Sequence, residues 1–542
     1  MVEFLNNKNS GFNNFVKNRA QNKDQGARPS FGNRMLIWTV LLMGIWMFFF
    51  QEKSTPVRTL PIEIDRELDL SGVTILDFMS QSISYTVQGL RISNIILNDY
   101  RLNKNSPGLP SETMFDREHK VEHNVRLLGG DREFIEVGLF GNGTSAPTAQ
   151  TEWQDMQDTT DVTWKGDNAE FRRSVKSGNY VIIITDAVKN TSAASIQIMP
   201  YTRIVRHGSV ERRRFGIRTG AISLIKNRIK TETWNRLTKK SPIFQTDNSA
   251  FTGFSDQYWQ TITRVKTETP QTIRIRQRMD ELFQTETTGE WVAIEPGQTH
   301  TFETAVFAGP KTQTALAKAN EQIPGIDRTI DYGWFGFLSR PMLWTLEKIH
   351  GFIPNWGLAI ILLTLIIRGF MWPLTRKSFV AMQAMQKIQP ELQRIQKLYA
   401  NDKMRMQQEI MRMYRSKKAN PFAGIGLMIL QVPIFFALYK ALVVAVPLRH
   451  AEFLWIRDLS AMDALFIMPI LMGLTMWVQG KFTHAKNSTA PGANMMKYLP
   501  FIFAGVFAWM PSGLVLYWTT SNIAGIFQLW LMRKEKTNGK NK

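Results

Sequence analysis

The segment 356–376, WGLAIILLTLIIRGFMWPLTR, is the most informative apolar run of the chain. Its length matches the about 20 apolar residues that a helix needs to cross a bilayer. Arg368 interrupts it two helical turns before Arg376, and Thr364 lies one turn before Arg368. A charge at membrane depth is costly and usually marks a functional site, although a long side chain can also extend to the headgroups. The pattern predicts a transmembrane helix with a polar site inside it.

Five other apolar runs resemble membrane spans. They are residues 35–50, 421–446, 464–480, 498–510 and 512–532. The first run carries no charge and follows a long polar segment, and no small-x-small cleavage site comes after it. We therefore interpret it as a retained anchor, with a cleaved signal peptide as the alternative. The pattern predicts six transmembrane helices in all.

A period-2 pattern fills residues 51–330. Short runs rich in Val, Ile, Thr and aromatic residues, such as NYVIIITDAV and QTIRIRQ, alternate with turn residues. This pattern is typical of an all-β sandwich of antiparallel strands. The segment shows no nucleophile constellation and no Gly-rich phosphate loop, so we expect no active site in it.

The segment 331–355 has apolar residues at intervals of three and four, with charged residues between them. The predicted apolar stripe consists of Trp334, Phe335, Leu338, Met342, Leu346 and Ile349. We predict a helix that lies in the plane of the membrane interface. A helix buried against the sandwich is the alternative.

Residues 377–419 repeat the helical pattern in a strongly basic, Met-rich form, with a turn predicted at Asn401 and Asp402. We predict a helical hairpin. Methionine is over-used on surfaces that accept varied partners. The Met-rich face therefore contacts incoming polypeptides, holds the two helices together, or does both.

The positive charge of the chain sits beside the apolar runs. The net charge is +21, yet residues 51–355 hold 37 basic and 36 acidic residues. The segments 1–34 and 376–420 carry net charges of +4 and +8. Basic loops mark the cytoplasmic side of a membrane protein. We therefore predict a cytoplasmic basic tail at 1–34, a cytoplasmic loop at 481–497 and a cytoplasmic basic tail at 533–542. Both termini are then cytoplasmic, and the β domain lies outside.

Composition excludes several kinds of chemistry. The chain has no cysteine and only 7 histidines. Disulfides, thiol catalysis and cysteine-ligated metals are therefore excluded, and a histidine metal site is disfavoured. No Walker-type phosphate loop is present. We expect no catalytic residue, no metal, no cofactor and no enzymatic activity.

Several motifs occur in one order along the chain. They are FAGPK (307–311), DYGWF from residue 331, NWGLAIILLTLIIRG, WPLTR, NPFAGIGLMILQVPIFFALY, FLWIRDLSAMD, PILMGLTM and WMPSGLVLYW. Through them the chain resembles the YidC/Oxa/Albino family of membrane protein insertases, in the Gram-negative YidC form with a large periplasmic domain. One departure is Trp518, where the family often has a second tyrosine after Tyr517.

The resemblance implies a fold and a function. The fold is a polytopic α-helical membrane protein with six transmembrane helices, a five-helix insertase core, a periplasmic β-sandwich and a cytoplasmic hairpin. The function is insertion and folding of integral membrane proteins in the inner membrane, alone or with the Sec translocon. The partners are nascent membrane proteins, Sec translocon subunits, lipids, and the ribosome through the basic C-terminal tail and cytoplasmic loops. No small-molecule substrate is implied.

The resemblance also implies a hydrophilic intramembrane groove whose central arginine is Arg368. We expect polar and aromatic residues of the same span and of later spans to line the substrate-binding groove with it. These are Thr364, Gln431, Tyr517, Trp518, Ser521 and Asn522. Phe435 and Phe503 would form the surface along which the apolar substrate segment slides. Polar residues in spans also often bond only across helices.

Two other functions stay open at this point. A structural assembly chaperone without insertion activity of its own is one. A secondary transporter with an anion site is the other, although the internal repeats usual in transporters are not found.

Overall fold

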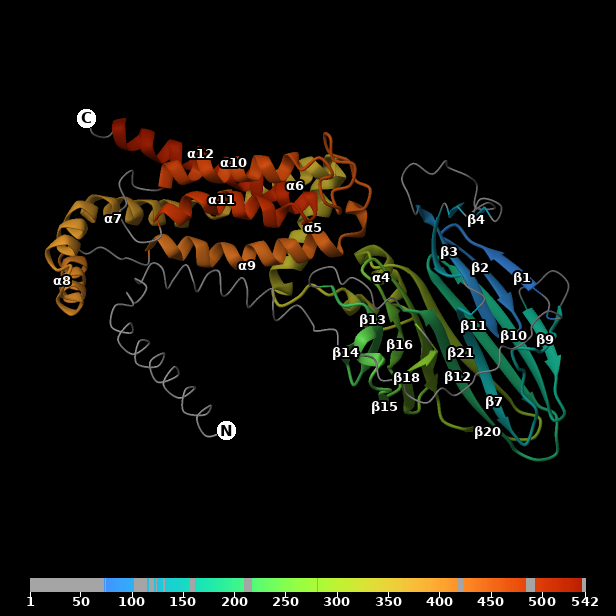
Figure 1. The fold of residues 1–542 in the computed structure, drawn as a ribbon. Coiled ribbons are helices and arrows are strands. Elements are labelled where there is room, and N and C mark those ends of the chain that lie inside the picture. The colour runs from blue at the N-terminus through green and yellow to red at the C-terminus, as the bar shows by residue number, and fades with distance from the viewer. Residues whose placement is uncertain are drawn as a thin grey trace, which may run out of the picture.

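The computed structural model describes residues 73, 75–101, 115–116, 121–122, 124–129, 132–155, 161–208, 217–279, 281–417, 423–483 and 493–538. Within these residues, a β-strand domain and an elongated helical region lie end to end (Figure 1). The predicted tail 1–34 and the predicted anchor 35–50 lie outside the described residues, as do the last four residues of the predicted C-terminal tail.

Two large antiparallel sheets form the β domain. The first sheet contains β1 (Ile75–Met79), β2 (Ile83–Gln88), β3 (Arg91–Arg101), β7 (Phe134–Asn142), β12 (Ile196–His207), β19 (Leu282–Thr288), β18 (Gln271–Met279) and β15 (Ile243–Thr246) in spatial order, with β6 (Asn124–Leu128) beside β3 and β20 (Val292–Ile294) beside β12. The second contains β14 (Arg228–Thr233), β13 (Gly220–Ile225), β16 (Phe251–Ser255), β17 (Trp259–Lys266), β21 (Thr299–Pro310), β11 (Val181–Asn190), β10 (Ala169–Gly178), β9 (Asp161–Lys165) and β8 (Gln154–Asp155). A short pair, β4 (Phe115–Asp116) and β5 (Val121–Glu122), is separate.

Alternating side chains close the space between the sheets. In β11, Ile182, Ile184, Asp186 and Val188 are buried, with half-buried residues at the positions between them. Ile182 and Ile184 share one apolar cluster with Ile83 of β2 and Ile135 of β7, so both sheets contribute to a common core. The period-2 pattern read from the sequence therefore predicted the sandwich correctly.

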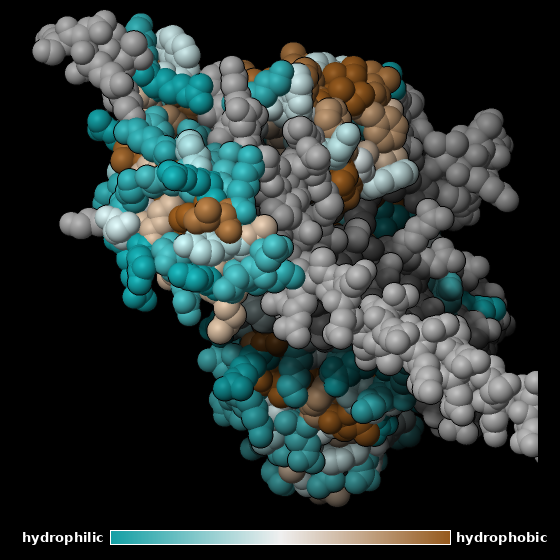
Figure 2. Space-filling view, turned by 60° about the vertical axis from the view of Figure 1, so that its left-hand side comes forward, coloured by the Kyte–Doolittle hydropathy of each residue, from teal (hydrophilic) through white to brown (hydrophobic). Residues whose placement is uncertain are grey.

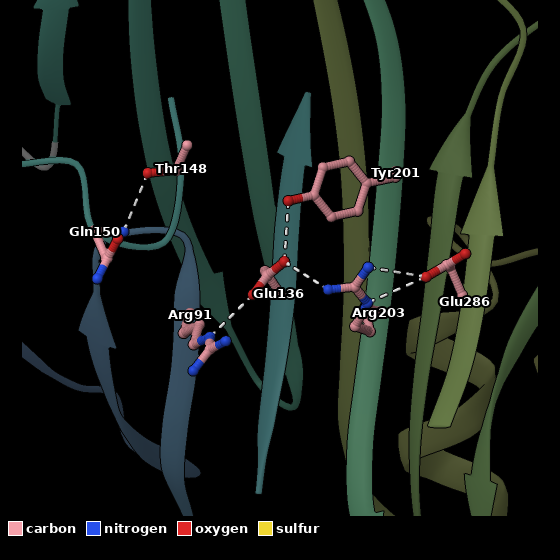
Figure 3. Close-up of polar contacts among 7 residues, drawn as sticks. All are labelled: Arg91, Glu136, Thr148, Gln150, Tyr201, Arg203 and Glu286. Carbon is pink, nitrogen blue, oxygen red and sulfur yellow. Dashed lines mark hydrogen bonds and ion pairs between the residues drawn. The ribbon is translucent and has the colours of Figure 1, made fainter. Parts of the chain in front are cut away.

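A buried carboxylate organises the polar face of the first sheet (Figure 3). Glu136, 4% exposed, accepts hydrogen bonds from Arg91 Nε at 2.9 Å, Tyr201 OH at 3.0 Å and Arg203 Nη1 at 3.3 Å. Arg203 Nη2 also donates to Glu286 Oε2 at 3.0 Å. These bonds join β3, β7, β12 and β19 side by side, and they compensate the desolvation of Glu136.

The helical elements follow the strands in the chain. Within or directly after the β domain lie α3 (Trp234–Leu237), α4 (Gln313–Ala319) and the short 3₁₀ helix η3 (Ile326–Thr329). The helical region contains α5 (Gly336–Phe352), α6 (Trp356–Phe370), α7 (Trp372–Leu398), α8 (Lys403–Ser416), α9 (Ala423–Val444), the 3₁₀ helix η4 (Val446–Leu448), α10 (Ile467–Thr483), α11 (Ala493–Phe507) and α12 (Ser512–Asn538).

The predicted span 356–376 is not one continuous helix. The chain bends by 61° between α6, which ends at Phe370, and α7, which begins at Trp372. Pro373 lies in the first turn of α7, where its missing N–H breaks no hydrogen bond and its fixed φ suits a new helix. The predicted end of this helix at residue 376 is therefore wrong, because the apolar pattern continues through the bend and does not reveal it.

Within the described residues, no single helix has both the length and the apolar composition of a membrane span. The bent pair of α6 and α7 satisfies the length and composition together. Six transmembrane helices therefore stay a prediction.

Three other boundaries differ from their predictions. Helix α10 begins at Ile467, three residues after the predicted start, because Asp463 side-chain oxygens accept bonds from Leu465 N and Met468 N. Helix α11 begins at Ala493, inside the predicted loop 481–497, and the residues after Gly492 are good helix formers. Helix α12 runs to Asn538, so the tail predicted from 533 begins as helix.

Helix α5 buries one of its faces against neighbouring helices. The buried side chains are those of Ser339, Leu343, Leu346 and Ile349, and the helix contacts α6 and α9. Trp334 precedes the helix and is 95% exposed. Of the rest of the predicted apolar stripe, Leu346 and Ile349 are buried, and Phe335, Leu338 and Met342 are half-buried. The interfacial position of α5 stays a prediction.

Helices α7 and α8 occupy the segment predicted as a hairpin, with Asp402 Oδ1 accepting the Arg405 N–H at the start of α8. Ile388 and Met413 are buried between them, so part of the Met-rich face holds the helices together. Met404 and Met411 are exposed. In Figure 2, hydrophilic side chains cover most of this end of the molecule, with a hydrophobic patch among them.

Candidate functional site

Arg368 lies in the last turn of α6 and is 8% exposed. Its Nε donates a hydrogen bond of 2.8 Å to Ser521 Oγ of α12, and Ser521 is also buried. Helices α6 and α12 pack along each other. This packing brings together two residues that the sequence placed in the same site.

Two further residues of α12 surround Arg368, and the sequence analysis missed both. Gln528 Nε2 donates to the Arg368 carbonyl oxygen at 3.2 Å. A Cβ at Gly525 would lie 3.6 Å from Arg368 Nη2 and 2.8 Å from Gln479 Nε2. Ser521, Gly525 and Gln528 follow each other at intervals of four and three, which places them on one face of a helix. This spacing was the feature of the sequence that could have identified Gly525 and Gln528 as neighbours of Ser521.

The electrostatics of Arg368 are unusual for a buried cation. Among the described residues, Arg368 forms no ion pair. A buried charge normally has a partner of opposite charge, because desolvation costs several kcal/mol. The guanidinium has five N–H donors, and the bond to Ser521 engages the Nε donor. The arrangement suits a ligand that brings a carboxylate or several carbonyl oxygens.

The other predicted polar residues bond between or within helices. Gln431 Nε2 of α9 donates to Tyr517 OH of α12 at 2.9 Å, and Tyr517 is 1% exposed. Asn522 Nδ2 of α12 donates to Thr475 Oγ1 of α10 at 3.1 Å. Thr364 Oγ1 donates to the Ile360 carbonyl of its own helix at 2.6 Å. These bonds fit the alternative that such residues join helices. Tyr517 also interacts with Ser521, the hydrogen-bond partner of Arg368, and so connects this set to the arginine.

Trp518 is the centre of an aromatic cluster from three helices. Its ring centroid lies 5.0 Å from that of Phe435 in α9. The centroids of Phe503 and Phe507 in α11 are 6.1 and 5.1 Å away. Phe435 and Phe503 are therefore near neighbours that share Trp518 between them. Because Trp518 follows Tyr517, this cluster directly adjoins the polar contacts of α12.

The structure thus joins a large β domain to a group of apolar helices that bury an arginine. Residues 348–540 match the family model described as 60Kd inner membrane protein, and residues 80–345 match that of the YidC periplasmic domain. The chain is 32% identical to the membrane protein insertase YidC of Methylobacillus flagellatus over 83% of this chain and 85% of the relative. The chain belongs to the YidC family of membrane protein insertases.

Other comparisons agree. The membrane protein insertase YidC of Haemophilus ducreyi is 32% identical over 73% of this chain and 76% of the relative. A crystal structure of an active YidC insertase with its first transmembrane domain resolved is 17% identical and covers 91% of this chain and 98% of that one. Its TM-score of 0.37 is too low to transfer any geometry.

Family membership confirms the resemblance drawn from the motifs. It gives this chain a place in the membrane, a periplasmic β-sandwich domain and the general function of a membrane protein insertase. Its clients are therefore membrane proteins. The family matches assign no role to Arg368 or to any other single residue.

Proposed function

We propose that Arg368 receives polar and acidic segments of client polypeptides inside a hydrophilic groove of the membrane-embedded helices. The single observation that carries this proposal is the environment of Arg368. The guanidinium is buried and bonded to Ser521 Oγ at 2.8 Å, and it forms no ion pair among the described residues. A client carboxylate would supply the missing negative charge.

The groove lowers the barrier to moving a polar tail across the membrane. The hydrocarbon core is about 30 Å thick, and polar groups lose their hydration inside it. A water-filled groove that reaches partway in shortens that distance. Arg368 binds the carboxylate by charge-assisted hydrogen bonds, which are stronger where the dielectric is low. Thr364, Gln431, Asn522 and Tyr517 supply the uncharged polar lining with Ser521.

The aromatic cluster gives the apolar part of the client a path. Phe435 of α9 and Phe503 of α11 are half-buried beside Trp518. The client span slides along these two helices and then partitions sideways into lipid. Burial of its apolar surface in the bilayer drives the step. No nucleotide is required for this mechanism.

In the proposed topology, the β domain lies on one side of the membrane, and the termini and helices α7 and α8 lie on the other. Six spans carry the chain through the bilayer, with both termini cytoplasmic and the β domain periplasmic. Support comes from the arrangement in Figure 1, where α8 lies at the end of the helical region farthest from the β domain. Helices α7 and α8 then meet nascent chains first. The basic C-terminal tail and the cytoplasmic loops contact the ribosome, and the Sec translocon is a partner for some clients.

The test uses purified protein in liposomes and a single-span client whose translocated tail is acidic or neutralised to Asn and Gln. Arg368→Ala should lower insertion of the acidic client far more than that of the neutral one. Arg376→Ala, an exposed basic residue of α7, is the matched control and should insert both clients normally. Insertion by the purified protein also separates an insertase from an assembly chaperone.

The Arg368→Lys variant distinguishes the role of the positive charge from that of the guanidinium geometry. The lysine keeps the positive charge but loses the planar fork of donors. Full activity of the lysine variant means that charge suffices. Full insertion of the acidic client by the alanine variant would overturn the proposal.

A further inference from the structure

A small pocket lies at the junction of the β domain and the helical region. Its volume is about 370 Å³, and its lining includes Arg328 of η3, Tyr332 in the connecting segment, and Phe337, Arg340 and Pro341 of α5. The pocket is far from Arg368 along the chain and takes no part in the insertion mechanism above. It combines two cations with an apolar wall.

The contacts of the two arginines leave most of their donors available. Arg328 Nη1 donates to Asn227 Oδ1 at 2.6 Å. Arg340 Nη2 lies 3.9 Å from Asp327 Oδ2, at the outer limit of an ion pair. Each guanidinium has five N–H donors, and the contacts found among the described residues engage few of them. Two guanidinium groups lining one pocket suit a phosphate, which arginine binds through paired hydrogen bonds.

Exposed aromatic side chains occur in the pocket lining, just before α5 and further along α5. Trp334 is 95% exposed and Phe337 is 73% exposed, and further along α5 Trp344 is 53% exposed and Phe352 is 87% exposed. Aromatic side chains are typical of the boundary between headgroups and hydrocarbon, where one part of the ring is dry and the other wet. A free phosphate ion or an acidic peptide would leave this apolar surface in water, whereas a lipid covers it.

We infer that the pocket binds the phosphate of a lipid headgroup from the outer leaflet. Arg328 and Arg340 hold the phosphate, and Phe337 and Pro341 contact the glycerol and the first part of the acyl chains. The inference rests on the periplasmic β domain of the proposed function and on the interfacial position of α5 predicted from the sequence. Basic pockets beside membrane helices are a general way to bind headgroups. Anionic phosphatidylglycerol is the preferred ligand, because it carries no ammonium group that the arginines would repel.

Lipid retention by the full chain tests the inference without any insertion measurement. The purified protein in detergent micelles is titrated with phosphatidylglycerol, and bound lipid is counted by native mass spectrometry. The pocket variant is Arg328→Gln with Arg340→Gln. The matched control is Arg172→Gln with Arg236→Gln, two exposed arginines of the β domain with side chains 56% and 63% exposed.

The pocket variant should bind phosphatidylglycerol about tenfold more weakly than the parent, as expected from losing charge-assisted bonds. The control should bind normally, and Phe337→Ser should weaken lipid binding while both arginines remain. Circular dichroism confirms that each variant is folded.

Three results would overturn the inference. The first is equal lipid retention by the parent and the pocket variant, and the second is equal loss in the control. Millimolar inorganic phosphate is the competing ligand. The third result is complete displacement of the lipid by phosphate, which would show a simple anion site in place of a lipid site. Because insertion is not measured, failure here leaves the role of Arg368 untouched.

Discussion

The Nε atom of Arg368 in α6 donates a 2.8 Å hydrogen bond to the Oγ atom of Ser521 in α12. Both side chains are buried, and the two residues are 153 positions apart in the chain. The bond therefore fixes one orientation of a buried cation through a neutral partner. A neutral partner holds the guanidinium in place without cancelling its charge.

Ser521→Ala should reduce insertion of a client with an acidic tail. The substitution removes the acceptor and leaves a buried N–H without a partner, which costs about 1–3 kcal/mol. Ser521→Thr keeps the hydroxyl and should retain most activity. The measurement is the initial rate of insertion into liposomes with equal amounts of each variant. Equal rates for the alanine variant and the parent would show that Ser521 does not position Arg368.

Gly525 should tolerate alanine but not leucine. A Cβ there would meet the flexible end of Gln479 at 2.8 Å and the Arg368 guanidinium at 3.6 Å. Gln479 can move aside for a methyl group, whereas a leucine side chain would displace the guanidinium. Gly525→Leu should therefore lose insertion of the acidic client to the same degree as Arg368→Ala.

Gly505 of α11 provides the control for this substitution. A Cβ at Gly505 has no atom within 4 Å in the described structure. Gly505→Leu should insert clients like the parent. A loss in both leucine variants would point to a general effect on helix packing, and normal activity of Gly525→Leu would contradict the predicted crowding.

The sequence was sufficient for the features that depend on local pattern. Period-2 alternation predicted the sandwich, and one charge inside an apolar run drew attention to Arg368, which the structure buries. The chain bend at Met371 and the inward face of α5 depend on packing between helices. An apolar pattern says that a side chain avoids water, but it does not say which neighbour the side chain contacts. Pro373 was a local signal for the bend that the apolar run masked.

For the same reason, the sequence predicted only some of the residues that contact Arg368. Ser521 was expected near it, because polar residues in separate spans tend to meet. Gly525 has no side chain and so gives no chemical signal. Its role follows only from the close approach of α12 to the guanidinium. Gln528 lies near the predicted end of a span, where a polar residue is ordinary.

Lys311 should make the stability of the protein depend on alkaline pH. Its side chain is buried, and its Nζ donates to the Asp256 carbonyl at 3.0 Å. Burial lowers the pKa of Lys311 from 10.5 to about 8, against the attraction of Asp256 and Asp331. The unfolded chain therefore binds more protons between these two values, and stability rises with pH across that window. Above pH 10.5 the lysine is neutral in the folded and in the unfolded chain, so its burial carries no charge penalty. As the pH falls through about 8, the buried lysine becomes protonated and this part of the stability is lost.

Lys311→Met should remove this dependence. The pKa difference corresponds to a destabilisation of ~3 kcal/mol by the protonated buried lysine, and the variant is relieved of it. The variant also loses the hydrogen bond to the Asp256 carbonyl, which offsets part of the gain. The variant should therefore gain thermal stability relative to the parent at neutral pH, and this gain should shrink at pH about 10. Thermal unfolding of the purified protein in detergent measures it. Lys266→Met, at a side chain that is 61% exposed, is the control. A stability difference that does not vary with pH would contradict the assignment.

The last prediction concerns Arg173 and Asp186, which form a buried pair inside the sandwich. Arg173 Nε and Nη2 donate to the Asp186 carboxylate at 2.7 and 2.8 Å, and Nη2 also donates to the Val137 carbonyl of the other sheet at 2.7 Å. Removing one partner leaves an uncompensated buried charge. Arg173→Leu should therefore lower the free energy of unfolding of the β domain by about 3–5 kcal/mol.

The neighbouring pair gives a control of the same chemistry at the surface. Arg172 Nη2 lies 2.7 Å from Asp161 Oδ2, but the arginine side chain is 56% exposed. Arg172→Leu should cost less than about 1 kcal/mol, because water and salt screen such pairs. The double variant Arg173→Leu with Asp186→Leu should recover part of the lost stability. Recovery stays incomplete, because the Val137 carbonyl then has lost its donor from the opposite sheet. Equal costs for Arg172→Leu and Arg173→Leu in thermal unfolding would show that the buried pair does not join the sheets.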